Sequence, residues 1–119
     1  MKQVMFIELG MGTDLHGQNI TKAAVRAVQD AIRCNSMPGL PSLLPGGDLN
    51  EMKINVKLAV PCDKDKLDLA QVRAVFPYGK VDIEVCDGGM VTSSGILLPD
   101  KGDRNDLIYI VNAAVEVGV

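Results

Sequence analysis

The stretch VMFIELGMGTDLHGQNITKAAVRAVQDAI, residues 4–32, contains the pattern that decides the fold. The run Val4–Leu9 is almost continuously apolar, which predicts a central strand covered on both faces. Apolar side chains from Ile20 onward recur every three or four residues, which predicts an amphipathic helix ending near Asn35. Asn19 is a good N-cap for this helix, because its side-chain oxygen can accept a free backbone N–H.

Three more strands and one more helix are predicted downstream. The strands are expected at residues 53–60, 81–85 and 107–117, and the second helix at residues 63–76. The resulting order, βαβαββ, predicts one mixed α/β (α+β) domain over residues 1–119, in which two helices cover one face of a four-stranded sheet. Two segments rich in glycine, proline or serine, 36–50 and 88–106, are expected to be loops.

The composition limits the classes of function. With 119 residues, 47% of them hydrophobic, the chain is long and apolar enough to form one globular core. A net charge of −3 and only 3% aromatic residues argue against nucleic-acid binding, which needs a basic surface. No segment has the pattern of a membrane span or a signal peptide, and the three cysteines lack metal-binding spacing. These features predict a cytoplasmic protein with free thiols and no membrane partner.

The predicted sheet leaves one face uncovered, because two helices can cover only the other. The first and last strands are too apolar for a face in water, so we expect this face to meet another copy of the chain. A closed ring of subunits would cover the face and also remove the exposed strand edges. The sequence therefore predicts a homo-oligomer.

The segment GMGTDLHG, residues 10–17, combines three glycines, a carboxylate and the only histidine of the chain. It matches the pattern GxGxDxHG, and through this motif the chain resembles a small, broadly distributed family of conserved hypothetical proteins, the Lin family. Four further segments resemble the same family, at residues 35–39, 45–49, 75–79 and 106–115. The resemblance extends over the full length of the chain. It implies no particular reaction, because the family has no established function.

A second resemblance concerns only the order of elements. This order is similar to that of the barrel-type chorismate mutases and the YjgF-type reactive-intermediate deaminases. Those proteins form trimers with sheets inside, helices outside and ligand clefts between subunits, and cyanuric acid hydrolases join three copies of a related unit in one chain. By fold analogy, the similarity implies a trimer or a multiple of trimers with a small-molecule site at the subunit junctions.

Asp14 and His16 are the candidate catalytic pair. In one interpretation, Asp14 orients His16 as the proton-transfer group of a lyase, an isomerase or an amidohydrolase. In a second, both residues bind a divalent metal such as zinc, with a third ligand from Asp48, Glu8, Asp87 or another subunit. In a third, Asp14 caps the turn and His16 closes a structural hydrogen bond.

Several other residues are candidates for contacting a ligand: Gly10, Gly12, Gly17, Asp48, Ser94 and Asn112. The glycines suit tight turns or a close approach of another chain or a ligand. Asn112 is a polar residue within an apolar strand, so it needs a hydrogen-bond partner if it is buried. The charged turn 100–106 is expected to be solvated surface, from which Arg104 would reach a carboxylate-bearing ligand.

These residues together predict a function in outline. We expect a small polar metabolite to bind in an intersubunit cleft lined by the segments 10–17, 38–48 and 88–95. The first alternative is a metal-binding protein that uses Asp14 and His16 as ligands. The second is a non-catalytic metabolite sensor or assembly module.

Overall fold

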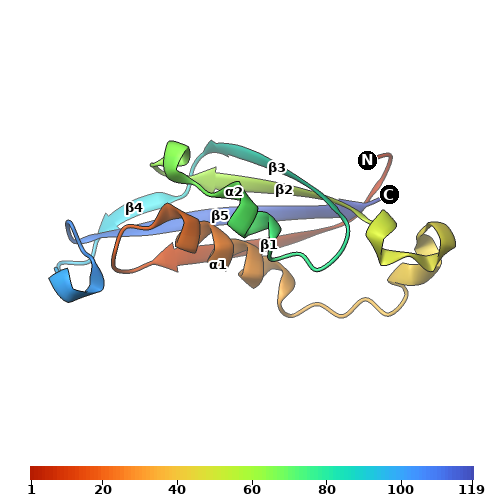
Figure 1. The fold of residues 1–119 in the computed structure, drawn as a ribbon, viewed down its shortest axis with the longest axis horizontal. Coiled ribbons are helices and arrows are strands. Elements are labelled where there is room, and N and C mark those ends of the chain that lie inside the picture. The colour runs from red at the N-terminus through yellow and green to blue at the C-terminus, as the bar shows by residue number, and fades with distance from the viewer.

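The computed structural model describes residues 1–119 and contains one mixed five-stranded sheet and two α-helices (Figure 1). Its elements are β1 (Val4–Asp14), α1 (Ile20–Ile32), β2 (Lys53–Val60), α2 (Leu69–Arg73), β3 (Lys80–Asp87), β4 (Met90–Ser93) and β5 (Leu107–Gly118). The strand order is β1-β5-β2-β3, with β2 and β3 parallel and β5 antiparallel to both of its neighbours. The predicted mixed α/β class is confirmed.

β4 corrects the predicted strand number from four to five. This strand lies in the segment 88–106, which was expected to be a loop, and it pairs antiparallel with residues 107–110 of β5. All of its residues are exposed, so the segment lacks the alternation of buried and exposed side chains that identifies a strand. Backbone pairing with β5 creates β4, and sequence pattern alone does not report such a long-range contact.

β1 also differs from its prediction, because it continues through the glycines to Asp14. Gly10 and Gly12 lie within the strand and face α1. A Cβ atom on Gly12 would lie 2.2 Å from the carbonyl oxygen of Ala23 and 2.2 Å from the amide nitrogen of Ala27. The absence of side chains at these two positions lets the backbone of the helix approach the strand closely. They therefore serve packing inside one chain, instead of forming part of a loop.

The first helix starts where the sequence predicts, whereas the second is much shorter than predicted. Asn19 caps α1 as predicted, since its Oδ1 accepts a hydrogen bond from the amide of Lys22 at 3.2 Å. The helix ends at Ile32, a few residues before the predicted end at Asn35. The expected helix over residues 63–76 is divided into a 3₁₀ turn at Lys64–Lys66 and the short α2. Asp68 lies between these two elements, has an extended backbone and caps α2.

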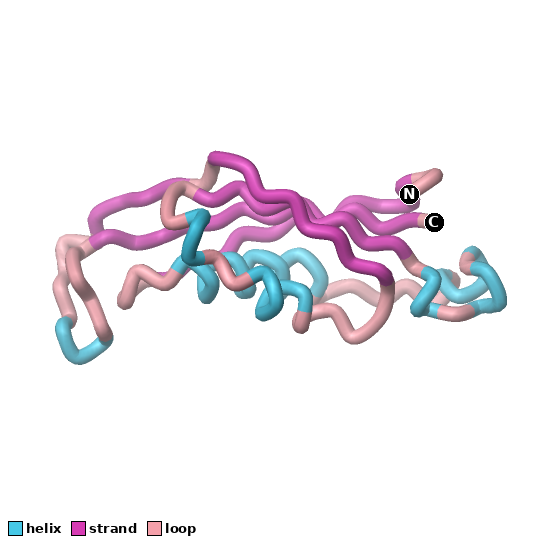
Figure 2. The backbone as a smooth tube through the Cα atoms, turned by 45° about the horizontal axis from the view of Figure 1, so that its top comes forward, coloured by secondary structure: helices cyan, strands magenta, loops and turns pink.

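Both helices lie on the same side of the sheet, which places the core between them and the sheet (Figure 2). The small side chains of α1 at Ala23, Ala24 and Ala27 are completely buried against it. The branched side chains of β2 and β5 complete this core: Val56, Leu58, Val60, Val111 and Val115. Small helix residues opposite branched strand residues explain how this core packs with few aromatic side chains.

The side of the sheet that faces away from the helices, which we call the open face, is apolar over β1, β4 and the adjoining part of β5. It is polar over β2 and β3, where Lys57 and Glu84 lie beside Glu116. Paired residues of antiparallel strands point to the same side of a sheet. This register places the following residues on the open face: Ile7, Leu9, Met11, Thr13, Met90, Thr92, Ile108, Ile110, Asn112 and Ala114. The exposed fraction is 57% for Ile7, 74% for Leu9, 56% for Met11 and 58% for Met90. Such a gathering of exposed large apolar side chains is unusual for a surface in water.

The molecule is elongated, with extents of 52 × 23 × 19 Å. The 3₁₀ turns of the segment 40–51 lie at the end that carries both termini, whereas the turn at 99–101 lies at the opposite end (Figure 1). One chain therefore does not bring the segments 38–48 and 10–17 together into one cleft. None of the helices has the length and apolar character that crossing a membrane requires.

Candidate functional site

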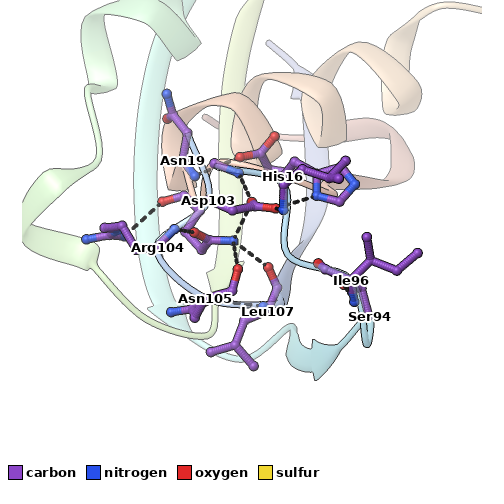
Figure 3. A network of polar contacts seen from close by, with 12 residues as sticks. His16, Asn19, Ser94, Ile96, Asp103, Arg104, Asn105 and Leu107 are labelled. Carbon is purple, nitrogen blue, oxygen red and sulfur yellow. Dashed lines mark hydrogen bonds and ion pairs between the residues drawn. The ribbon is translucent and has the colours of Figure 1, made fainter. Parts of the chain in front are cut away.

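His16 and Asp103 form a hydrogen-bonded pair (Figure 3). Asp103 follows the 3₁₀ turn at 99–101, which lies at the end of the molecule away from the termini (Figure 1). The Nδ1 atom of the imidazole lies 2.7 Å from Oδ2 of the carboxylate. The Asp103 side chain is fully buried, and the His16 side chain is 27% exposed. The backbone amides of Gly17 and Leu98 also donate to Asp103, at 2.6 and 2.9 Å. A carboxylate from the charged turn thus ties together the segments before α1 and before β5.

The buried side chain of Gln18 also links the segment before α1 to the segment before β5. Gln18 has a backbone φ of 47°, which a non-glycine residue rarely adopts. Its Nε2 donates to Asp103 and to two backbone carbonyl oxygens, those of Asn105 and Leu107, while its Oε1 accepts from the amide of Arg104. The dense bonding of one side chain offsets the strain of its backbone. The position of Asp103 against His16 is therefore held on several sides.

The environment of Asp103 keeps its carboxyl group ionised. Burial opposes ionisation, but hydrogen bonds from Leu98, Gly17, His16 and Gln18 outweigh it and lower the pKa of Asp103 well below its ordinary value. An ionised carboxylate only accepts hydrogen bonds, so the Nδ1 atom of His16 carries the proton between them. In the neutral imidazole, the Nε2 atom then has a free lone pair, and no protein group bonds to it. This arrangement suits a general base.

The lowered pKa of Asp103 predicts a pH-dependent contribution to stability. Above an unfolded-state pKa of about 3.9 this contribution is fully present, and it is lost as the pH falls through the lower folded-state pKa. We expect Asp103→Asn to lower the melting temperature at pH 7, and the difference from the unmodified protein to shrink below about pH 4. Thermal melts across this pH range measure the effect. Asp100→Asn, an exposed change in the same turn, is the control. A constant difference at all pH values would contradict the assignment.

Asp14 has another role than the predicted one of orienting His16. Its Oδ2 accepts from the backbone amide of Asn19 at 2.7 Å, and its Oδ1 lies 3.5 Å from a guanidinium nitrogen of Arg26. Because β1 extends to Asp14, this side chain follows the inner face of the sheet toward α1. The carboxylate that orients His16 is Asp103 instead. The charged turn 100–106 was expected to be solvated surface, and no short-range signal marks Asp103 as a partner.

The structure does not assemble the metal ligands that were considered for Asp14 and His16. No group of three or more His, Cys, Asp or Glu side chains lies close enough to hold one ion. The proposed third ligand Asp48 accepts from the amide of Asn50 in a 3₁₀ turn, in the segment toward the termini. One chain alone therefore does not bring three metal ligands together, and a ligand from another subunit stays a prediction.

The remaining predicted ligand residues are separated from one another. Gly17 joins the Asp103 network through its amide, with a φ of +100° that favours glycine. Ser94 bonds locally, since its Oγ donates to the carbonyl of Ile96 at 3.0 Å. Asn112 is exposed on the open face, so its side chain is not a buried group in need of a partner. Figure 3 shows Ser94 and Ile96 on the His16 side of the network, away from Arg104.

A polar pocket of about 230 Å³ lies on the other side of this network. Its lining includes the charged side chains of Asp63, Lys66 and Arg104. Asp63 accepts a hydrogen bond from the hydroxyl of Tyr109 at 3.2 Å. Burial, Cys62 and Asp63 raise the pKa of Tyr109 to about 12, so this hydroxyl stays protonated at neutral pH. Lys66 and Arg104 give the pocket the donors that an anionic group needs. Arg104 lines this pocket, and its contact with a carboxylate-bearing ligand stays a prediction.

The fold and the site define a small mixed α/β protein with an uncovered, partly apolar sheet face and a buried aspartate that holds a partly exposed histidine. The chain belongs to the Lin0512 family of conserved hypothetical proteins, whose family model matches residues 4–117. The resemblance based on the GxGxDxHG motif is confirmed.

One solved structure with a similar fold is the crystal structure of an FtsZ-like protein of unknown function from Nostoc punctiforme. It has 40% sequence identity and a TM-score of 0.84, and the match covers 97% of this chain and 93% of that chain. No curated protein sequence matches the chain.

Proposed function

We propose that this protein is a homo-oligomer, a trimer or a multiple of trimers, that binds a small polar metabolite beside His16 at a junction between subunits. The pair of His16 and Asp103 is the observation that carries the proposal. The buried carboxylate of Asp103, which accepts several hydrogen bonds, holds the Nδ1 atom of the imidazole, and the other ring nitrogen is left free. This is how enzymes orient a histidine for proton transfer.

The open face supports the oligomeric part of the proposal. Its exposed side chains Ile7, Leu9, Met11 and Met90 form an apolar surface of the kind that protein interfaces bury. The outer edges of β1 and β3 have no strand partner. A closed ring with its sheets turned inward covers the face and protects both edges at the same time. A second copy of the chain is therefore the occupant that we assign to the open face.

The surroundings of His16 support a site that one chain leaves incomplete. The side chains of Leu15, Ile96 and Leu97 near it are 54%, 55% and 53% exposed. A neighbouring subunit packed on these residues would cover the free side of the imidazole and exclude water from it, which strengthens polar interactions with a ligand. The backbone of the segment 15–19 is fixed by Asp103 and Gln18, so the imidazole is pre-organised for such a contact.

His16 acts in this proposal as the proton-transfer residue and Asp103 as the residue that positions it. The class of reaction is a lyase, an isomerase or an amidohydrolase, because each of these depends on moving a proton at a polar substrate. The predicted partner Asp14 contributes only indirectly, by holding the start of α1 through Asn19. A non-catalytic sensor would use the same cleft without turnover, and the experiment below separates the two.

The test compares the unmodified protein with His16→Asn. The asparagine side chain can still donate to Asp103 as Nδ1 does, but it lacks the free nitrogen. We expect the variant to melt close to the unmodified protein. Compounds that stabilise the unmodified protein in a metabolite screen are then followed by NMR for conversion, which we expect to fall by about 100-fold or more in the variant.

The controls decide which part of the proposal holds. Ser94→Ala changes a neighbouring polar side chain that bonds only within its own turn, so it should retain conversion. Binding without conversion would favour the sensor. If His16→Asn binds and converts every compound as the unmodified protein does, His16 is not part of the site.

A further inference from the structure

A second cavity, of about 310 Å³, lies beside the C-terminal end of α1 and shares no residue with the His16 network. Its walls are mainly apolar and include Phe6, Met37, Leu40, Met52, Phe76 and Tyr78. This size and this kind of lining are typical of sites for small organic ligands. The cavity is therefore separate from the proposed metabolite cleft.

Glu8 is the unusual residue of this cavity. It lies in β1 on the same side as Gly10, facing the helix layer, although a carboxylate is poorly suited to apolar surroundings. Its Oε2 is buried and has no hydrogen-bond partner. Burial raises the pKa of this carboxyl group. An orphaned buried acceptor costs stability, so a fold that keeps one at a cavity wall indicates a partner from outside the chain.

The other groups that line the cavity indicate the chemistry of that partner. No Lys, Arg or His lines the cavity, so the protein offers no counter-ion there. The second polar lining residue, Asn35, donates one N–H of its side-chain amide to the carbonyl oxygen of Ala31 at 3.1 Å, which leaves its oxygen and its other N–H. Apart from the hydroxyl of Tyr78 and the second N–H of Asn35, the lining side chains present only acceptors, and the carboxylate of Glu8 has no cationic partner among them. The complement of the cavity is a molecule that donates hydrogen bonds and carries positive charge.

We propose that this cavity binds a small organic ammonium compound, whose N–H groups donate to Glu8 and whose apolar body packs against the aromatic and methionine side chains. The ammonium group forms a charge-assisted hydrogen bond with the carboxylate. The rings of Phe6, Phe76 and Tyr78 attract a cation placed over their faces. This site goes beyond the proposed function, since it uses neither His16 nor the open face.

The experiment uses phenethylammonium as the probe and methyl-labelled methionine as the reporter. Met37 and Met52 line the cavity, whereas Met11 and Met90 lie on the open face and serve as internal controls. We expect the probe to shift the first two signals, with a Kd on the order of 1 mM for so small a compound. Phenethyl alcohol and hydrocinnamate, which match the probe in shape but lack the positive charge, should bind several-fold more weakly.

Glu8→Gln identifies the group responsible, because it removes the charge and keeps the volume. We expect it to weaken phenethylammonium binding by roughly fivefold or more, and to melt at least as high as the unmodified protein at neutral pH, since it removes a buried charge. Glu84→Gln, an exposed change on β3, should leave binding unchanged. The proposal is overturned by no shift of Met37 and Met52, by equal binding of hydrocinnamate, or by a smaller loss in Glu8→Gln.

Discussion

Gly12→Ala is expected to lower the melting temperature by roughly 15 °C or to prevent folding, a loss of about 4 kcal/mol or more. The added methyl group would lie 2.2 Å from the backbone of α1 at both Ala23 and Ala27. Real side-chain contacts are never so short, and backbone atoms cannot rotate away as a flexible side chain can. The helix would have to leave the sheet over the length of β1, which opens the core that the two elements share.

A matched control for this prediction is Gly39→Ala. Gly39 has a φ of −81°, which any residue adopts, and its added Cβ atom would meet nothing within 4 Å. Thermal and urea unfolding of the two variants beside the unmodified protein measure the difference. If Gly12→Ala and Gly39→Ala unfold together, the close contact between β1 and α1 is wrong.

Leu9→Lys is expected to convert the proposed oligomer into single chains of 12.7 kDa. Leu9 lies within the apolar part of the open face, and its side chain is 74% exposed in one chain. A lysine there costs the isolated chain little, because surface changes usually alter stability by less than about 0.5 kcal/mol. Packed against a second copy, the same lysine would be a buried charge without a partner, which an interface rarely survives.

Light scattering coupled to size exclusion measures this change directly. The unmodified protein should elute at three times the mass of the chain, or at a multiple of that mass. Leu43→Lys is the control, since Leu43 is 64% exposed but lies in a 3₁₀ turn outside the open face, and we expect it to keep the assembled mass. The oligomeric proposal is wrong if the unmodified protein is monomeric at micromolar concentration, or if the Leu9→Lys variant stays assembled. Either result would leave the proposed ligand site at Glu8 unaffected.

The two predictions also separate the roles of neighbouring residues in β1. Gly12 faces the helix layer, whereas Leu9 and Met11 face the other side of the sheet. One strand therefore carries a packing contact inside the chain on one face and the proposed subunit contact on the other. Damage to the first should remove the fold, and damage to the second should remove only the assembly.

The candidate site was predictable from the sequence only in part. The histidine in the glycine-rich segment stands out as a single residue of its type, and the structure does place it in a buried polar network. Its partner lies 87 residues away, and nothing in the turn that contains Asp103 distinguishes it from the other acidic residues there. Asp14, nearer in sequence, bonds to the start of α1 because its strand continues further than its pattern indicates.

What the sequence determined by itself was local. The alternation of residues 53–60 and the three-to-four spacing after Asn19 specify β2 and the start of α1, because these patterns depend only on near neighbours. The tertiary structure alone decided that Gly10 and Gly12 belong to a strand, that β4 pairs with β5, and that Asp103 holds His16. Each of these depends on which distant backbone approaches, and that is settled only when the sheet and helix close around a common core.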